Sequence, residues 1–268
     1  MDRNHPLLVV GGAAVLALGL VTPVAFGADA PVADAAMKGE AEAVRSLITA
    51  GADVSVPQGD GMTALHWAAF QDDADLAQVL IDASANVEAE TRIGAIRPLS
   101  MAATNGSATM IDLLVDAGAS VNSATTTGAT PLMAAATSGS VEAVGRLLDH
   151  GAFVNARETA NGQTALMFAA WENRADVVAL LVERGAHAGL SSWIVSMVEP
   201  RFDDDGNPRP ARRPRAPGAN SVMGGMTALL FAARDGHLDA LRALVEGGAN
   251  VDQVAGGEGS SPMVIAWS

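Results

Sequence analysis

The sequence contains no cysteine, and this absence excludes three kinds of feature. Its 268 residues cannot form a disulfide, a thiolate metal site, or the lipid-modified cysteine that follows some export signals. No pair of consecutive arginines precedes the first apolar run, which also excludes a twin-arginine signal. The general secretory route is therefore the export route that remains open.

Positively charged residues are scarce. The chain has 16 lysine and arginine residues, only one of them lysine, against 30 aspartate and glutamate residues, so its formal charge is −14. Proteins that bind nucleic acid normally present a basic surface to the phosphates. The sequence therefore predicts no nucleic-acid partner, and it favours a partner that is basic or neutral.

A short phrase, by contrast, returns every 33 or 34 residues. Its strong copies share a leucine at the third position and paired alanines at the sixth and seventh, and they begin at Thr63, Arg97, Thr130, Thr164 and Thr227. Weaker copies begin at Ala30 and Ser261. A period near 33 with two short helices and a turn indicates a helical solenoid, in which each unit packs only on its neighbours.

These phrases resemble the signature of ankyrin repeats. The resemblance implies an all-α solenoid of stacked helix-turn-helix repeats joined by hairpin loops. It places repeats one to five at residues 28–189, repeat six at 226–254, and the start of a truncated repeat seven at 255–268. The family commonly has histidine at the fourth position of the phrase, and this chain keeps it only as His66.

Each predicted repeat has two places where the chain needs a left-handed backbone. The first follows the paired alanines, between the two helices, and is occupied by Gly39, Asp72, Gly106, Gly139, Asn173 and Gly236. The second follows the second helix and is occupied by Gly51, Gly118, Gly151, Gly185 and Gly248. Repeat two has Ser84 at this second place. A non-glycine residue in the left-handed conformation costs about 1 kcal/mol, so we expect the stack of repeats to be less stable at repeat two.

The N-terminus predicts export. Arg3 precedes an apolar stretch from residue 7 to 26, and small residues follow it, which is the pattern of a secretory signal peptide at residues 1–27. The predicted location is periplasmic or secreted, with no membrane insertion after cleavage. The apolar run is also long enough to remain as an uncleaved anchor.

Residues 190–225 are predicted to be an inserted loop rich in proline and arginine, because the spacing between Thr164 and Thr227 exceeds one repeat. Its first part, from Trp193 to Val198, is apolar enough to lie on the solenoid. Three interpretations remain open for the arginine-rich part. It is a solvated linker or rests on the acidic surface of its own chain, it binds a partner, or it binds an anionic polymer or lipid surface.

The histidines predict no catalytic residue, no metal site and no cofactor. They are His5, His66, His150, His187 and His237. Catalysis needs groups that converge, whereas these histidines fall at different positions of the repeat. His150 and His187 occupy nearby loops, but no carboxylate or third histidine is expected beside them. Structural or surface roles are favoured for all five.

A protein-binding surface is what the resemblance implies. In ankyrin-like arrays the residues after the paired alanines and those at the hairpin tips line a concave face where partners dock. The partner-binding residues predicted on this basis are Phe70, Gln71, Arg92, Asn105, Trp171, Glu172, Arg234 and Asp235. Further hairpin-tip candidates are Met62, Ile96, Gln163 and Met226. Phe70 and Trp171 are the expected hot spots, and the alternative is that each packs on a neighbouring turn.

The predicted function is therefore that of a monomeric, non-catalytic protein-protein interaction module or scaffold that acts outside the cytoplasm. The alternative is a recognition arm of a longer protein, with a catalytic or signalling domain beyond residue 268. A solenoid specifies a surface and not a ligand, so the sequence names no partner.

Overall fold

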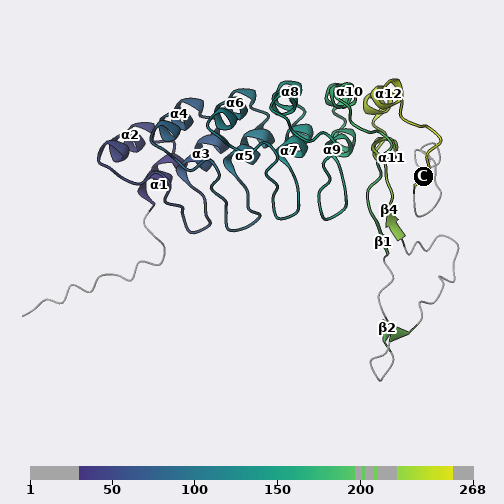
Figure 1. The fold of residues 1–268 in the computed structure, drawn as a ribbon, viewed down its shortest axis with the longest axis horizontal. Coiled ribbons are helices and arrows are strands. Elements are labelled where there is room, and N and C mark those ends of the chain that lie inside the picture. Colours follow the sequence, from purple (N-terminus) through teal and green to yellow (C-terminus); the bar gives the residue numbers. More distant parts are fainter. Residues whose placement is uncertain (1–29, 197–200, 203–207, 210–221, 256–268) are drawn as a thin grey trace, which may run out of the picture.

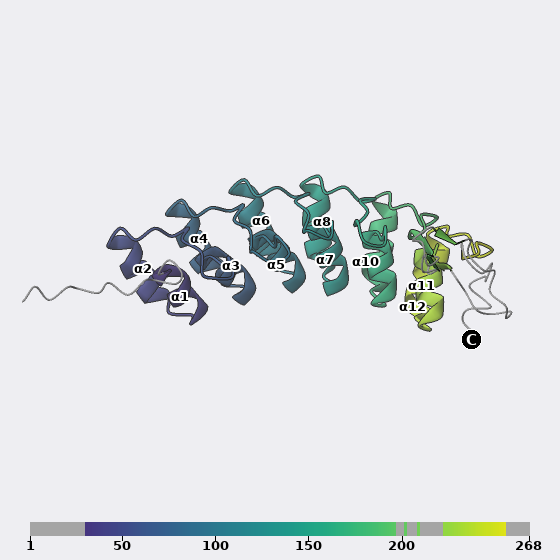
Figure 2. The same cartoon turned by 90° about the horizontal axis from the view of Figure 1, so that it is seen from below.

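The computed structural model describes residues 30–196, 201–202, 208–209 and 222–255, in which twelve helices form six antiparallel pairs. The inner helices are α1 (Pro31–Met37), α3 (Ala64–Gln71), α5 (Pro98–Asn105), α7 (Pro131–Ser138), α9 (Ala165–Trp171) and α11 (Ala228–Arg234). The outer helices are α2 (Ala41–Thr49), α4 (Ala74–Asp82), α6 (Ala108–Asp116), α8 (Val141–Asp149), α10 (Ala175–Glu183) and α12 (Leu238–Glu246). The two rows form parallel layers with hairpin loops projecting from one side (Figure 1), and the row of repeats is bowed (Figure 2). The fold is the predicted all-α solenoid.

The predicted signal peptide at residues 1–27 lies outside the described residues. So does the predicted start of repeat seven, apart from Ala255. Within the part of the chain that the structure describes, no helix has the length and apolar content needed to cross a membrane.

The inner helices begin directly after the first residue of each repeated phrase. Thr63, Thr130, Thr164 and Thr227 are N-cap residues in extended conformation, and the Thr227 hydroxyl accepts a hydrogen bond from the Leu230 N–H at 3.4 Å. Repeat three has Arg97 at this place instead. Its guanidinium pairs with Glu88 and Glu90 and donates to the Ala124 carbonyl at 3.3 Å, so it ties the hairpin to the helix start.

Both predicted left-handed positions are confirmed in every repeat. After the inner helices, φ lies between 54° and 85° at the four glycines and at Asp72 and Asn173. After the outer helices, φ lies between 66° and 100°, and the value of 66° belongs to Ser84. Ser84 keeps the usual end of an outer helix, because its N–H bonds the Ile81 carbonyl at 2.8 Å and the Ala85 N–H bonds the Leu80 carbonyl at 2.9 Å.

Replacing Ser84 by glycine is expected to raise the free energy of unfolding by about 1 kcal/mol, because glycine adopts φ of this sign without a steric cost. Urea denaturation followed by circular dichroism measures the change. Ser46, which is exposed inside α2, is the control, since glycine there should lower the free energy by roughly 0.5–1 kcal/mol. A loss of stability at both positions would contradict the expected strain at Ser84.

The outer helices use two pairs of positions to join neighbouring repeats. In α4 to α12 the third and seventh residues are buried, whereas in α2 the equivalent Ala43 and Leu47 are half-buried. The fourth residue is buried from α2 to α10, but its counterpart in α12, Leu241, is half-buried. The eighth residue of α12, Val245, is 47% exposed. Positions three and seven therefore face the preceding repeat, and positions four and eight face the following one.

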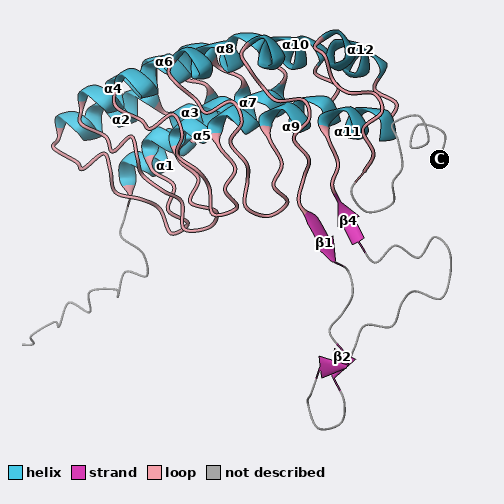
Figure 3. Ribbon diagram, turned by 45° about the vertical axis from the view of Figure 1, so that its right-hand side comes forward, coloured by secondary structure: helices cyan, strands magenta, loops and turns pink. Residues whose placement is uncertain are grey.

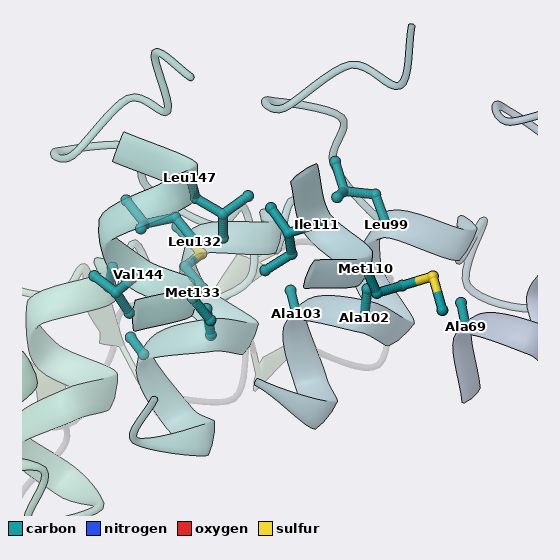
Figure 4. Packing of buried hydrophobic residues seen from close by; sticks show 14 of the residues in the cluster. Ala69, Leu99, Ala102, Ala103, Met110, Ile111, Leu132, Met133, Val144 and Leu147 are labelled. Atoms are coloured by element: carbon teal, nitrogen blue, oxygen red, sulfur yellow. The ribbon is translucent and has the colours of Figure 1, made fainter. Parts of the chain in front are cut away.

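The core is one continuous layer between the two rows of helices. Figure 4 shows its middle, where Met110 and Ile111 of α6 lie among Leu99, Leu132 and Leu147 from neighbouring helices. The substantial contacts between helices lie within a repeat or between neighbouring repeats. Burial is therefore shared along the stack instead of being gathered in one globular centre.

The loop between repeats five and six contains the four described strands (Figure 3). β1 (Ile194–Ser196) pairs antiparallel with β4 (Val222–Gly224), and β2 (Arg201–Phe202) pairs antiparallel with β3 (Pro208–Arg209). Trp193 packs against Gly162 of the preceding hairpin, while Ile194 is 55% exposed. The other residues of the predicted insertion lie largely outside the described part of the chain.

Neighbouring hairpins are joined near their tips by single backbone hydrogen bonds. The N–H of one hairpin donates to a carbonyl of the hairpin before it: Arg92 to Asp60 at 2.8 Å, Thr126 to Gly94 at 2.9 Å, Thr159 to Thr127 at 2.8 Å, and Trp193 to Asn161 at 2.6 Å. The hairpins thus form a regular row beside the inner helices.

Candidate functional site

The inner helices leave two positions uncovered. Their second, fifth and sixth residues are buried in every repeat, because these residues face the outer helices and neighbouring inner helices. The fourth residue is at least partly exposed in all but the last inner helix, and the seventh is at least partly exposed in all of them. We call these two rows the inner-helix face: Asp34, Trp67, Met101, Ala134, Phe168 and Phe231 at position four, and Met37, Phe70, Thr104, Thr137, Trp171 and Arg234 at position seven.

At repeats five and six this face carries two stacked rings, with a guanidinium group close to both. Trp171 and Phe231 have ring centroids 6.0 Å apart at an interplanar angle of 18°. The Arg234 guanidinium carbon lies 5.7 Å from the Trp171 ring centroid and 5.3 Å from that of Phe231. Trp171 therefore packs on the next repeat, as the alternative interpretation expected, yet 42% of its surface stays exposed.

Asp235 fixes the orientation of Arg234. The Arg234 Nε and Nη2 donate to the two carboxylate oxygens of Asp235 at 2.9 and 2.8 Å. These hydrogen bonds raise the pKa of Arg234 above its ordinary value and lower the pKa of the Asp235 carboxyl. The pair holds the guanidinium beside the two rings, so the three groups are ordered before any partner arrives.

A second aromatic group lies at repeat two. Phe70 is 58% exposed and meets Trp67 edge to face, with ring centroids 5.9 Å apart. Trp67 is partly buried, and its Nε1 donates to the Gln58 Oε1 at 2.8 Å. Gln58 in turn donates to the Asp34 carboxylate at 2.6 Å, which fixes the tryptophan between the hairpin and α1.

Gln71 and Asn105 lie where predicted, but their amides bond within the chain. The Gln71 Nε2 donates to the carbonyls of Ala36 and Met37 at 3.0 and 3.2 Å. The Asn105 Nδ2 donates to the carbonyls of Ala69 and Phe70 at 3.0 and 2.8 Å. These carbonyls lie at the end of the preceding inner helix, and those of Ala36 and Ala69 also accept a hydrogen bond from a backbone N–H of the turn that follows. The two amides therefore join repeats, and sequence reasoning had assigned them only to partner binding.

The hairpin-tip prediction is partly wrong. Arg92 is exposed at its tip, and Glu172 is exposed at the C-cap of α9. Met62 and Gln163 are each only 9% exposed, because the returning arm of each hairpin brings the residue before the threonine back onto the helices. Ile96 and Met226 are half-buried. Among the five predicted tip residues, Arg92 alone is exposed.

The rings of His66, His150 and His237 make contacts within the fold. His66 is buried, its Nδ1 lies 3.2 Å from the Thr63 nitrogen, and its Nε2 lies 3.0 Å from the Ile96 carbonyl oxygen. His150 does have a carboxylate beside it, contrary to expectation, since the Asp112 Oδ1 lies 3.0 Å from its Nε2. Among the described residues, no three histidine, aspartate or glutamate side chains are grouped closely enough to hold a metal ion.

Comparison with known proteins gives three successive matches to models of one repeat family. Residues 32–81 match "Ankyrin repeats (many copies)", residues 99–191 match "Ankyrin repeats (3 copies)", and residues 224–255 match "Ankyrin repeat". A comparison with curated protein sequences finds no significant relative.

Solved structures with the same fold include two ankyrin repeat domains. One is that of Bcl-3, described as a unique member of the IkappaB protein family, with a TM-score of 0.67 and 23% identity over 90% of this chain and 96% of that one. The other is that of human ASB11, with a TM-score of 0.68 and 24% identity over 88% of this chain and 91% of that one. At this level of identity, the likeness shows the fold alone.

Proposed function

Because the chain belongs to the ankyrin repeat family, we propose that it is a non-catalytic scaffold that binds a protein partner on its inner-helix face. Ankyrin repeats are generally protein-protein interaction modules. We propose further that it acts outside the cytoplasm, in the periplasm or as a secreted protein. The predicted signal peptide at residues 1–27 supports this location.

The exposed aromatic side chains are the observation that supports protein binding on the inner-helix face. The stacking of repeats requires no aromatic residue at position seven, because threonine occupies it in α5 and α7. Phe70 and Trp171 nevertheless stand there with 58% and 42% of their surfaces exposed. Large aromatic side chains held in place dominate measured interface energies, since they bury much area at little entropic cost.

Affinity capture from the extracytoplasmic fraction of the native cell tests both parts of the proposal. The natively processed chain should be recovered from that fraction and should retain one protein at defined stoichiometry. We expect Phe70→Ala together with Trp171→Ala to weaken retention at least about tenfold, because each truncation of a hot spot costs about 2 kcal/mol or more.

The control variant is Phe153→Ala. Phe153 is 68% exposed in the loop after the outer helix α8, and it belongs to neither row of the inner-helix face. Retention should be unchanged in this variant, and all variants should give the circular dichroism spectrum of the parent. Equal retention by the double variant and the parent would contradict partner binding on the inner-helix face. Absence of the chain from the extracytoplasmic fraction would contradict the proposed location.

A further inference from the structure

Arg174 reaches back from the start of α10 to the turn of the preceding repeat. It is the N-cap residue of α10, and it is exposed. Its Nε donates to the Thr137 carbonyl at 3.1 Å, at the end of α7. The side chain lies over Gly139, where a Cβ would come within 2.7 Å of the Arg174 Cδ and 2.9 Å of its Nε. Arg174 is therefore held at the edge of the inner-helix face, beside position seven of α7.

Arg174 is also left without a carboxylate. Every other described arginine that lies in a helix or caps one pairs with an aspartate or glutamate, and these are Arg45, Arg97, Arg146, Arg184, Arg234 and Arg242. Within the described ranges Arg174 forms no ion pair, not even with Glu172, two residues before it, and its two terminal amino groups make no hydrogen bond. In a chain of formal charge −14, this cation on the inner-helix face is thus open to an anion from outside.

The surface around Arg174 supplies no competing charge. Residues 98–107 and 131–140, which form α5, α7 and the turns after them, contain no aspartate, glutamate, lysine or arginine. The hydroxyls of Thr104 and Thr137 donate to carbonyls of their own helices at 2.9 and 3.0 Å, and the Asn105 amide donates to the end of α3. Arg174 therefore brings the charged donors to this stretch of the face.

The open guanidinium selects the chemistry of a contacting group. Its planar fork matches a carboxylate, to which it can donate two parallel hydrogen bonds. Part of the side-chain ordering is already done within the fold, because the Nε is bonded to Thr137. Trp171 stands at position seven of the neighbouring inner helix α9 and is 42% exposed. The two side chains together fit a carboxylate close to a large apolar group.

We propose that Arg174 binds the carboxylate of an aspartate or glutamate side chain of the partner, while Trp171 contacts a large apolar side chain a few residues away from it. This inference rests on the proposed function, and it adds the chemical character of the contact. A partner that is acidic throughout would be repelled by the chain's formal charge of −14. The acidic residue therefore belongs to a segment that is otherwise uncharged or basic.

A library of displayed random peptides is the probe. It is selected against the natively processed full chain, and the enriched peptides are synthesised with amidated C-termini and titrated. We expect them to carry an aspartate or glutamate near a large apolar residue. Their dissociation constants should rise at least about threefold between about 0.05 and 0.5 M salt, because salt screens an exposed ion pair.

A double-mutant cycle identifies the pair. Arg174→Gln should weaken peptide binding at least about tenfold, and changing the acidic residue of the peptide to its amide should weaken it by a similar factor. The two changes together should cause little further loss, because both remove the same ion pair. A merely structural role of Arg174 would give two independent losses instead.

Arg184→Gln is the matched control. Arg184 caps the other end of α10 and pairs with Asp149 at 2.7 Å, so its replacement should leave peptide binding unchanged. All variants should give the circular dichroism spectrum of the parent. If Arg174→Gln does not, Arg174→Lys takes its place in the cycle, because lysine keeps the charge but not the two parallel donors.

The possible failures are distinguishable. Enriched peptides without an acidic residue, or independent losses in the cycle, overturn the contact at Arg174, and the proposed function stands if Trp171→Ala still weakens these peptides. Peptides that bind only with a free C-terminus use the terminal carboxylate and overturn the choice of a side chain. A selection that yields no peptide dependent on Trp171 or Phe70 contradicts partner binding on the inner-helix face, and the inference fails with it.

Discussion

Leu114→Ala is expected to lower the free energy of unfolding by about 2–5 kcal/mol, the range for emptying a fully buried leucine site. Leu114 is 0% exposed at the seventh position of α6, where it faces the preceding repeat. Because helices contact mainly their neighbours in the stack, the loss should also uncouple the two halves of the array. Urea denaturation should then show two transitions where the parent shows one.

Leu47→Ala is the control for this prediction. Leu47 holds the same position in α2, where no described repeat precedes it, and it is half-buried. Its replacement should cost only about 1 kcal/mol, because less apolar area returns to water and little cavity is left. An equal cost at both positions would show that position seven does not serve the joint between repeats.

Stability is expected to fall with pH below about 6.5 through His66, whose burial lowers its pKa from the ordinary value of 6.5. The Ile96 carbonyl can only accept, so the Nε2 of His66 carries the proton and the Nδ1 accepts from the Thr63 N–H. The unfolded ring binds a proton near pH 6.5, whereas the folded ring resists it. The stabilisation is complete above that pH and is lost as pH falls toward the folded pKa.

His66→Ala should remove this pH dependence and cost about 2–4 kcal/mol near pH 7.5, because it leaves a cavity and two unpaired backbone groups. His66→Met tests the two effects separately. Met133 and Met167 hold the same position in repeats four and five and are each 2% exposed. The methionine variant should keep more of the stability while losing the pH dependence. Thermal unfolding measured from pH 5 to 8 gives the pH dependence of stability for the parent and both variants. An unchanged pH profile in either variant would contradict the assignment of this dependence to His66.

The periodic part of the fold could be predicted from the sequence because its causes are local. The leucine and paired alanines set which side of each inner helix is buried, and the residue after them sets the turn. The left-handed position of Ser84 was predicted from register alone, although serine disfavours it, and φ is 66° there. Here the packing of the repeats on both sides outweighs the preference of one residue.

The side-chain hydrogen bonds between neighbouring repeats could not be predicted, because they depend on which carbonyl or side chain lies opposite in the next repeat. The amides of Gln71 and Asn105 reach helix ends in the preceding repeat, and the Asp112 carboxylate reaches His150 from the repeat before. Such pairs are separated by about one period, but the sequence does not show which atoms face each other. Position four of the inner helices was missed for a simpler reason. It shares a helix face with position seven, three residues later, and that spacing was the available signal.

The row of hairpins has a consequence for how this surface can vary. The bonds between the tips join backbone N–H groups to backbone carbonyls, so they do not depend on the side chains of Arg92, Thr126, Thr159 or Trp193. Any residue except proline can stand at those positions and still donate the bond. These four residues can therefore vary while the distance from one hairpin to the next stays constant, whereas Gly61, Gly128 and Gly162 must stay, because a Cβ at each would collide with the next hairpin. A new partner can be recognised without the solenoid altering its pitch.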